Sequence, residues 1–516
     1  MQLLRSVTTI AGLTAISRIL GFARDILIAS FLGAGPIADA FFVAFKFPNF
    51  FRRLFAEGAF NAAFIPLFAR LYASEGLEKA TRYAEQIMAV LLLALLLFVA
   101  FVEVTLPWLI YGLAPGFKET PERLQYAINF TRITFPYILF ISLSACLGGI
   151  LNSLGRFSSA AAAPILLNIT MITALLSFNK NFETTGQGLV WAVMIAGIGQ
   201  YLWLYYSSYV SGVRLKWVRP RVTPVVKKLL QTMIPGSISA GVVQINLFFD
   251  VMIASFLPTG AVSFLFFADR LNQLPLSLIG IAMSTVLLPL TAKHLQRGEM
   301  EAAIYTQNRA LEYSMILTLP ATIALMVLAH PIISVLFERN HFGAYEALET
   351  SKVLVAFASG LPAYILIKIL STVFFAKLDT RTPLKAALLS LAVNVVSNLI
   401  LIVPLKHVGI ALSTALAAWV NVIYLLRILS KENLLKFDAR LKTRLPRIIF
   451  STVLMGFAIK ILDWSFKCYF CYGYKPISLI IVILLGGASY SGLALASKAF
   501  HLRDIAKYFT RKNFQS

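Results

Sequence analysis

Charged side chains that could bind an anion are concentrated in residues 17–68, a stretch that is otherwise rich in Phe, Leu, Ile and Ala. The charged residues there are Arg18, Arg24, Asp25, Asp39, Lys46, Arg52, Arg53 and Glu57. An Arg or Lys at the centre of a bilayer costs about 2.5–3.5 kcal/mol on insertion scales, so five of them cost on the order of 12–18 kcal/mol. These charges must therefore face water or a partner. The stretch predicts a water-filled, cationic cavity inside a helical bundle; the alternative is that the charges reach from helix ends to the membrane surface.

Helical spacing places the polar side chains of this stretch on two stripes. One stripe contains Asp39, Lys46, Asn49, Arg53 and Glu57, and the other contains Ser17 and Arg24, with Arg18 and Asp25 beside it. Gly33, Gly35 and Pro36 predict a turn between two helices. Pro48 removes a backbone hydrogen bond within the second helix. Each helix therefore presents a polar face to the expected cavity.

Arginine in such a cavity favours one class of ligand. Its guanidinium is a planar fork of donors that meets phosphate oxygens bidentately, and it stays charged at any accessible pH. A cluster of four arginines in a low-dielectric cavity is therefore typical of a site for a dianionic or pyrophosphate head group. Carboxylates can pair with the arginines while the cavity is empty, so that alternating access becomes a switch of partners between lobes. These carboxylates are Asp25, Asp39, Glu57 and Asp269.

The motifs that would indicate catalysis are missing from the sequence. The five histidines fall at predicted helix ends or in loops, and they are His294, His330, His341, His407 and His501. The sequence contains neither a G-x-x-x-x-G-K-[ST] phosphate loop nor an aspartate-rich metal motif. We therefore expect a transporter that is not an enzyme and that has no catalytic residue and no cofactor.

The composition is that of a polytopic membrane protein. Of the 516 residues, 59% are hydrophobic and 13% are charged. The net charge of +23 lies mainly in short loops and not in a basic patch with exposed aromatics, so we expect no nucleic-acid partner. Arg5 precedes an apolar segment without an A-x-A cleavage site, and the first helix is therefore expected to be retained.

Hydrophobic windows of about 20 residues, separated by loop signals, predict about fourteen transmembrane helices. Every second loop is basic, for example 214–228 and 427–447, whereas alternate loops such as 258–260 carry almost no positive charge. The positive-inside rule then places both termini in the cytoplasm, which requires an even number of helices. The expected spans are 3–32, 36–70, 83–112, 124–153, 158–178, 187–212, 225–257, 261–296, 303–329, 346–376, 384–403, 408–429, 444–466 and 475–499.

The chain repeats itself at an offset of about 225 residues. DILIASFLGAG, which begins at Asp25, recurs as DVMIASFLPTG from Asp250, and Asn168 corresponds to Asn394. The offset spans six helices, and an even number preserves direction, so the halves are parallel repeats as in rocking-lobe transporters. The fold is therefore expected to be all-α, with two six-helix lobes and two extra C-terminal helices. The expected domains are 1–213 for the first lobe, 214–430 for the second, and 431–516 for helices 13 and 14 with a basic cytoplasmic tail.

The repeat is asymmetric in charge. The second lobe keeps chiefly Asp250, Asp269 and Arg270 on its first two helices. Arg270 is expected near the depth of the basic residues of the first lobe; the alternative is a local pair with Asp269. Because Asp25 and Asp250 are equivalent, we expect them across the pseudo-two-fold axis at the periplasmic gate, with Ala29 one turn further out.

Six segments carry a resemblance to one family, and together they extend over essentially the whole chain. They are GFARD at 21–25, the highly specific run at 38–68, APGF at 114–117, RITFPYI at 132–138, FFADRL at 266–271 and RTP at 381–383. In these segments the sequence resembles the MurJ (MviN) family, the bacterial lipid II flippases of the multidrug/oligosaccharidyl-lipid/polysaccharide exporter superfamily.

The resemblance implies fourteen helices and a groove, formed by the last two, that admits an undecaprenyl tail. It implies transport of lipid II from the cytoplasmic to the periplasmic leaflet of the bacterial inner membrane, and hence a role in peptidoglycan biosynthesis, cell wall biogenesis and cell shape. By position, Arg18, Arg24, Arg52 and Arg270 match the required cavity arginines of the family, and Asp39 matches a cavity carboxylate. Gln273 stands where a cavity glutamate is usual, so no carboxylate role carries over there.

The residues and the resemblance together define the expected sites. The substrate-binding set is Ser17, Arg18, Arg24, Asp39, Lys46, Asn49, Arg52, Arg53, Glu57, Asp269 and Arg270, and the gate set is Asp25, Ala29 and Asp250. The resemblance also implies a sodium site, with Asp250, Asn394, Asn398 and Thr414 as ligands; the alternative is that these polar side chains bond neighbouring helices. Transport would be coupled to sodium or to the membrane potential.

Several alternatives stay open at this point. The alternative function is a flippase for another lipid-linked oligosaccharide or a related superfamily antiporter, although a drug-cation antiporter would be expected to have an acidic cavity. The expected partners are lipid II, membrane lipids and the cell-wall synthesis machinery, and the protein is expected to be a monomer. Cys146 lies in an apolar helix, and Cys468 with Cys471 forms a lone C-x-x-C that we interpret as incidental, with a periplasmic disulfide as the alternative.

Overall fold

The computed structural model describes residues 2–52, 60–177, 181–469 and 476–500. Within these ranges the regular elements are helices, apart from one antiparallel bridge between Arg339 and Phe342. Ten helical segments of the described chain are long and apolar enough to cross a membrane. The prediction of an all-α, polytopic membrane protein is therefore confirmed.

The predicted helical spans map onto these elements in order. The first seven helical elements are α1 (Gln2–Leu32), α2 (Pro36–Phe51), α3 (Phe60–Leu113), η2 (Pro115–Glu119), α4 (Pro121–Thr134), α5 (Tyr137–Ser153) and α6 (Phe157–Ser177). The next are α7 (Thr185–Val210), α8 (Pro224–Ser255), α9 (Ala261–Pro275), η4 (Leu276–Ile281), α10 (Ala282–Gln296) and α11 (Met300–Val327). The last are α12 (Ala329–Phe337), α13 (Ala344–Ala376), α14 (Arg381–Lys431), α15 (Ala439–Tyr469) and α16 (Pro476–Ala496).

Helix starts follow from short capping signals. Pro36 and Pro224 occupy the first turns of α2 and α8, where a missing backbone N–H costs no helical hydrogen bond. The Thr184 hydroxyl accepts a hydrogen bond from the backbone N–H of Gln187 at 3.2 Å and so caps α7. These signals explain why the predicted and observed boundaries differ by only a few residues.

Kinks account for most differences between predicted and observed elements. The break predicted between 70 and 83 is a bend at Gly76, whose φ of 83° lies in the left-handed region that glycine tolerates. The predicted helices 384–403 and 408–429 join in α14 at a bend at Lys406. The predicted span 261–296 contains a π-helical turn, η4, directly after Pro275.

One described α-helix was missed by the sequence analysis. The nine residues of α12 follow α11 after a break at Leu328. Such a segment is too short to give a membrane-spanning hydropathy signal, because crossing a bilayer takes about 20 residues. It therefore falls almost entirely in the gap between the predicted spans 303–329 and 346–376.

Packing divides the chain into two compact units, which are described separately. The first comprises Met1–Ser263 and Arg339–Gly343, and the second comprises Phe264–Glu338 and Ala344–Ser516. The division into lobes at 213 and 430, which the internal repeat predicts, stays a prediction.

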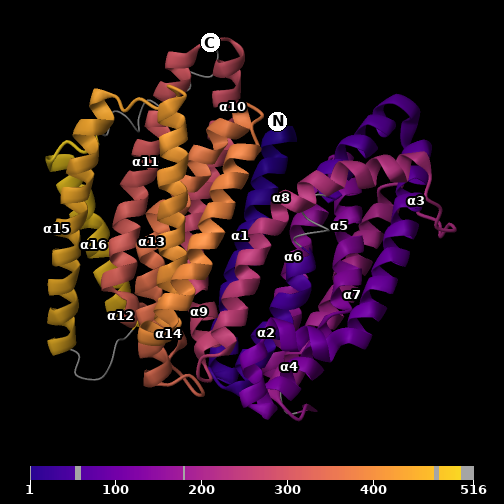
Figure 1. Cartoon of the computed structure of the whole chain (residues 1–516), viewed down its shortest axis with the longest axis horizontal. Coiled ribbons are helices and arrows are strands. Elements are labelled where there is room, and N and C mark those ends of the chain that lie inside the picture. The colour runs from indigo at the N-terminus through magenta and orange to yellow at the C-terminus, as the bar shows by residue number, and fades with distance from the viewer. Residues whose placement is uncertain (1, 53–59, 178–180, 470–475, 501–516) are drawn as a thin grey trace. The chain divides into compact units, whose positions relative to one another are not determined.

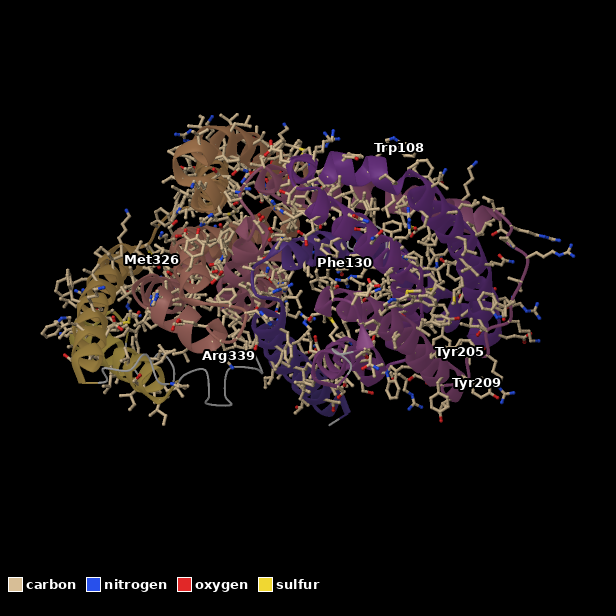
Figure 2. All side chains as sticks on the ribbon, turned by 90° about the horizontal axis from the view of Figure 1, so that it is seen from below. Trp108, Phe130, Tyr205, Tyr209, Met326 and Arg339 are labelled. Atoms are coloured by element: carbon tan, nitrogen blue, oxygen red, sulfur yellow. The ribbon has the colours of Figure 1, made fainter. Side chains whose placement is uncertain are left out.

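In the first unit, α6 packs against both α1 and α7, α7 packs against α5, and α5 packs against α3 (Figure 1). The ends of α3 and α7 carry exposed aromatic side chains: Trp108 is 69% and Tyr209 49% exposed, and Figure 2 shows both on the outside of this unit. Tryptophan and tyrosine in such positions are typical of the membrane–water interfaces.

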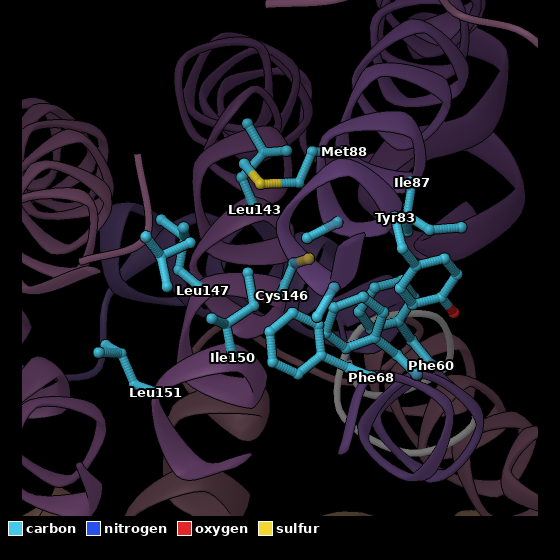
Figure 3. Close-up of a cluster of buried hydrophobic side chains, with 14 of the residues drawn as sticks. Phe60, Phe68, Tyr83, Ile87, Met88, Leu143, Cys146, Leu147, Ile150 and Leu151 are labelled. Atoms are coloured by element: carbon cyan, nitrogen blue, oxygen red, sulfur yellow. The ribbon is translucent and has the colours of Figure 1, made fainter. Parts of the chain in front are cut away.

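The core of the first unit is an aromatic and aliphatic cluster between α3 and α5 (Figure 3). The Phe64 ring stacks on those of Phe60 and Tyr83, with centroids 5.1 and 5.6 Å apart. Cys146 is fully buried in the same cluster, as its apolar helix predicts. Because lipid is as apolar as these side chains, close packing and ring geometry hold this core more than exclusion of water does.

In the second unit, α13 packs against α10, α11, α12 and α14, and α11 in turn contacts α15, which pairs with α16 (Figure 1). The last two helices of the chain, which lie outside the internal repeat, are therefore attached to this unit mainly along α11. A second apolar cluster, which includes Leu328, Met455 and Ile459, fills part of that contact.

Candidate functional site

Arg24, on α1, is buried and held by two partners. Its Nε and Nη2 atoms donate to the Asp25 carboxylate at 3.0 and 2.7 Å, and its Nη1 donates to the Asn168 side-chain oxygen at 2.9 Å. The Asn168 amide nitrogen in turn donates to the backbone carbonyl of Ser17 at 2.9 Å. The structure thus brings together Ser17, Arg24 and Asp25 from the predicted set and adds Asn168, from α6. Arg18, by contrast, is exposed.

Asp39 lies near the start of α2 and is fully buried. It accepts hydrogen bonds from the guanidinium of Arg123 at 3.1 Å and from the hydroxyl and backbone N–H of Ser263 at 2.7 and 3.0 Å. The backbone N–H of Gly260 donates to the same carboxylate at 2.8 Å. Asp39 therefore ties α2 to α4 and to the residues where α9 begins.

Arg123 was missed by the sequence analysis. It lies at the start of α4, one residue before the predicted span 124–153, and was therefore read as a loop residue. A signal was available, because a single arginine beside an apolar run must either reach the interface or find an acidic partner. The sequence offered no means of choosing Asp39 as that partner.

The second half of α2 carries a short polar ladder. The Asn49 amide donates to the Phe45 carbonyl at 2.7 Å, and the Arg52 Nε donates to the Asn49 side-chain oxygen at 3.0 Å. Lys46 and Arg52 are both half-buried. Spacing on one helix predicted a shared stripe for Lys46 and Asn49, but it did not assign Arg52, which bonds Asn49, to that stripe. Two other members of the predicted substrate-binding set, Arg53 and Glu57, lie outside the described residues.

In the second unit, Asp269 and Arg270 on α9 each have a described partner one turn away on the same helix. The Gln273 amide donates a hydrogen bond to the Asp269 carboxylate, one turn away. The Arg270 guanidinium lies 4.6 Å from the centre of the Phe266 ring, a cation–π distance, and is half-buried. The side chain at 273, where a glutamate was expected from the resemblance, thus serves as a donor and supports Asp269.

The predicted sodium ligands are partly brought together. The Asn398 amide donates to the Asn394 oxygen at 3.0 Å, and the Asn394 amide donates to the Thr414 hydroxyl oxygen at 3.3 Å. These three residues belong to the second unit, whereas Asp250 belongs to the first. Among the described residues, no group of three or more His, Cys, Asp or Glu side chains could hold a metal ion. An oxygen site built from amides and hydroxyls stays a prediction.

The predicted gate residues lie in the first unit. Ala29 is fully buried, and only 3% of the surface of Asp25 is exposed. Asp250 is half-buried. Asp25, from the gate set, forms a buried ion pair with Arg24, from the substrate-binding set. Whether these residues close the periplasmic side stays a prediction.

An apolar cavity of about 510 Å³ lies in the second unit between α11, α15 and α16. Leu317, Ala324, Met455, Ile483 and Gly487 are among its lining residues. Tyr490 crosses the same contact, and its hydroxyl donates to the Ile316 carbonyl at 2.8 Å. A cavity of this size and polarity suits a hydrocarbon chain.

A buried ionic cluster lies beside this cavity, and the sequence analysis did not predict it. Glu312 on α11 is fully buried and accepts hydrogen bonds from Arg440 at 3.0 Å and Arg444 at 2.6 Å. Arg309 donates to Glu312 and also to Asp438, in the segment that joins α14 to α15. The cluster therefore fastens the start of α15 to α11.

Comparison with known proteins gives a consistent result over most of the chain. A family model described as "Lipid II flippase MurJ" matches residues 28–481. The "Probable lipid II flippase MurJ" of Rhizobium meliloti (strain 1021) is 42% identical over 470 residues, which cover 90% of this chain and 88% of that protein. That of Rickettsia prowazekii (strain Madrid E) is 38% identical over 509 residues, covering 98% of this chain and 99% of its own.

Solved structures agree with the sequence comparison. A structure described as "Lipid II flippase MurJ, inward closed conformation" has a TM-score of 0.79 and 27% identity, and the match covers 96% of this chain and 99% of that one. An inward-facing MATE family transporter of the MOP superfamily, at 17% identity and a TM-score of 0.65, shares the fold. The chain belongs to the lipid II flippase MurJ family.

Proposed function

We propose that this protein is a lipid II flippase of the bacterial inner membrane, a transporter and not an enzyme, with both termini in the cytoplasm. It moves the undecaprenyl-pyrophosphate-linked peptidoglycan precursor from the cytoplasmic to the periplasmic leaflet by alternating access through a cationic cavity. The observation that carries the proposal is the placement of arginines on membrane helices of a chain whose relatives bear that name.

Three arginines are assigned to the pyrophosphate. Arg52 and Arg270 are half-buried; Arg52 donates to the Asn49 side-chain oxygen at 3.0 Å, and the Arg270 guanidinium lies 4.6 Å from the centre of the Phe266 ring. Arg24 is buried against Asp25 and Asn168. A guanidinium can meet two oxygens of one phosphate at once, and such charge-assisted, bidentate pairs are among the strongest polar contacts in proteins.

The apolar cavity between α11, α15 and α16 is assigned to part of the lipid tail. It is lined mainly by aliphatic and aromatic side chains, which match an isoprenoid chain. A lipid with a charged head group and a long tail needs both kinds of surface. A cationic cavity alone does not distinguish it from other anions, and an apolar cavity alone does not distinguish it from other lipids.

The test replaces Arg24, Arg52 and Arg270 singly with lysine. Lysine keeps the positive charge but loses the bidentate fork, so each variant should insert at normal abundance and fail to rescue a strain depleted of its own flippase. Arg82→Lys is the matched control, because Arg82 is an exposed residue of α3 that pairs with Glu78. Depletion of the protein itself should make lipid II accumulate in the inner leaflet.

Full activity of all three lysine variants would exclude recognition of pyrophosphate by these arginines. Accumulation of a different lipid-linked oligosaccharide on depletion would assign the protein to another substrate of the same superfamily.

A further inference from the structure

Asn168 connects two parts of α1 that the sequence places two turns apart. Its oxygen accepts a hydrogen bond from Arg24, its amide nitrogen donates to the Ser17 carbonyl, and only 5% of its surface is exposed. Gly21, between them on α1, faces the same side chain, and a Cβ placed there would lie 3.6 Å from the Asn168 nitrogen. One amide on α6 therefore holds one face of α1.

All three nitrogens of the Arg24 guanidinium donate hydrogen bonds to Asp25 or Asn168. Asp25 compensates its charge through Nε and Nη2, and Asn168 receives the Nη1 donor, with the Met171 sulfur 4.0 Å from the same atom. A buried cation with such partners is stabilised in place, because each hydrogen bond to a charged group contributes more than a neutral one. A pyrophosphate that engages Arg24 must compete with these contacts.

Comparison of the two repeats distinguishes the contact of this asparagine with Arg24 from its contact with the neighbouring segment. Asn394, its equivalent, bonds Asn398 and Thr414, and the position equivalent to Arg24 is Phe249. Asn168 therefore joins α6 to α1, and Asn394 joins the two segments of α14 on either side of the bend at Lys406, whereas contact with an arginine at the position of Arg24 belongs to the first repeat alone.

We propose that Asn168 is a positioning residue that, together with Asp25, stores Arg24 in a charge-compensated pose from which the substrate must withdraw it. The proposal rests on the function proposed above for the part that concerns lipid II. The free energy needed to release Arg24 from these contacts lowers the net affinity of the protein for the anion. Changing Asn168 should therefore alter both the reactivity of Arg24 and the affinity for the substrate.

The first experiment needs no substrate. Full-length protein in lipid nanodiscs is treated with phenylglyoxal, and the adduct at Arg24 is quantified by peptide mass spectrometry. Asn168→Ala removes one hold on the guanidinium and should speed modification about tenfold, which corresponds to about 1.4 kcal/mol. Asn168→Asp places a second carboxylate on the guanidinium and should slow modification. Gln200→Ala is the matched control, because Gln200 is a buried amide on α7 that donates to the Ala163 carbonyl at 2.9 Å.

The second experiment measures binding of lipid II to the same proteins. Asn168→Ala should tighten binding and Asn168→Asp should weaken it, each about tenfold, and neither should have an effect in an Arg24→Ala background. A structural role would lower affinity in both variants, in both backgrounds. Equal phenylglyoxal rates in wild type, Asn168→Ala and Asn168→Asp would overturn the storage proposal.

The two arms separate the inference from the proposed function. If lipid II binds the Arg24→Ala protein as well as wild type while the phenylglyoxal rates change as expected, storage stands and the assignment of Arg24 to pyrophosphate falls. If Arg24→Ala loses binding but the Asn168 variants change neither readout, the function stands and the storage proposal falls.

Discussion

Arg123 donates a hydrogen bond to Asp39 at 3.1 Å, and both side chains are at least 97% buried. The guanidinium also lies 4.1 Å from the centre of the Phe117 ring and donates to the Leu257 carbonyl at 3.4 Å. This ion pair therefore joins α2, η2, α4 and the loop after α8 within the first unit. A buried pair of this kind is costly to break, because removing one partner leaves the other charge without compensation.

Replacing Arg123 with leucine should destabilise the protein by about 3–5 kcal/mol, since Asp39 would lose the cation that compensates its buried carboxylate. Asp39→Asn should destabilise it as well, because one carboxylate oxygen accepts from Ser263 and the other from Arg123 and Gly260, whereas an amide has only one acceptor oxygen. Thermal unfolding in detergent measures both. Arg82→Leu, which breaks the exposed pair with Glu78, should leave the unfolding temperature unchanged. Equal unfolding temperatures for Arg123→Leu and Arg82→Leu would contradict the role assigned to this pair.

The ionic cluster on α11 gives a second prediction. Glu312→Ala would leave the guanidinium groups of Arg309, Arg440 and Arg444 facing one another, so the segment 431–439 should detach from α11. Trypsin should then cleave at Lys431, Lys436 and Arg440 much faster than in the unsubstituted protein. Glu301→Ala, near the start of the same helix, is an exposed control. Unchanged cleavage after Glu312→Ala would show that apolar packing alone holds α15.

Orientation in the membrane is tested by thiol labelling. Thr259 and Ser158 are both exposed, and the loop charges place them on opposite sides of the membrane. A cysteine at Thr259 should react with a membrane-impermeant reagent from the periplasm, and one at Ser158 should react only after the membrane is opened. A background without Cys146, Cys468 and Cys471 removes other thiols. The reverse labelling pattern would reverse the topology and the direction of transport.

The positions of the helices follow from local features of the sequence, whereas the contacts between helices do not. Hydropathy and turn residues act locally, so 3–32 and 346–376 differ from α1 and α13 by no more than two residues at either end. Helical periodicity also placed Asn49 on one stripe with Lys46 and Arg53, whereas the described side chain that donates to Asn49 is that of Arg52. It does not say which helix packs opposite. Asn168 is 144 residues from Arg24, and only the folded chain pairs them.

The same limit applies to charges that end up inside the protein. Asp39 was grouped with Lys46 on one helical stripe, but its described ion-pair partner is Arg123, which comes from a different helix. Arg440 and Arg444 lie 128 and 132 residues from Glu312 in sequence and meet it where α15 packs on α11. A buried charge needs a partner, and helical spacing does not predict a partner that is distant in sequence. Such clusters are therefore found only in the folded structure.

The cavity between α11, α15 and α16 gives the last prediction, and α16 supplies its own control. Gly487 lines the cavity, and a Cβ built there would have no atom within 4 Å, so a large side chain can enter without moving the backbone. Gly492, further along the same helix, is equally open but does not line the cavity. Gly487→Trp should therefore fill the space proposed for the lipid tail, whereas Gly492→Trp should not.

The measurement is photo-crosslinking to lipid II that carries a photoreactive group on its isoprenoid chain, with protein abundance and unfolding temperature as checks on folding. Adducts to residues of α11, α15 and α16 should fall several-fold in Gly487→Trp, and transport should fall with them, because the tail would lose its apolar surface while the arginines still bind the head group. Gly492→Trp should behave as wild type. If Gly487→Trp crosslinks and transports normally, the tail of the substrate does not use this cavity.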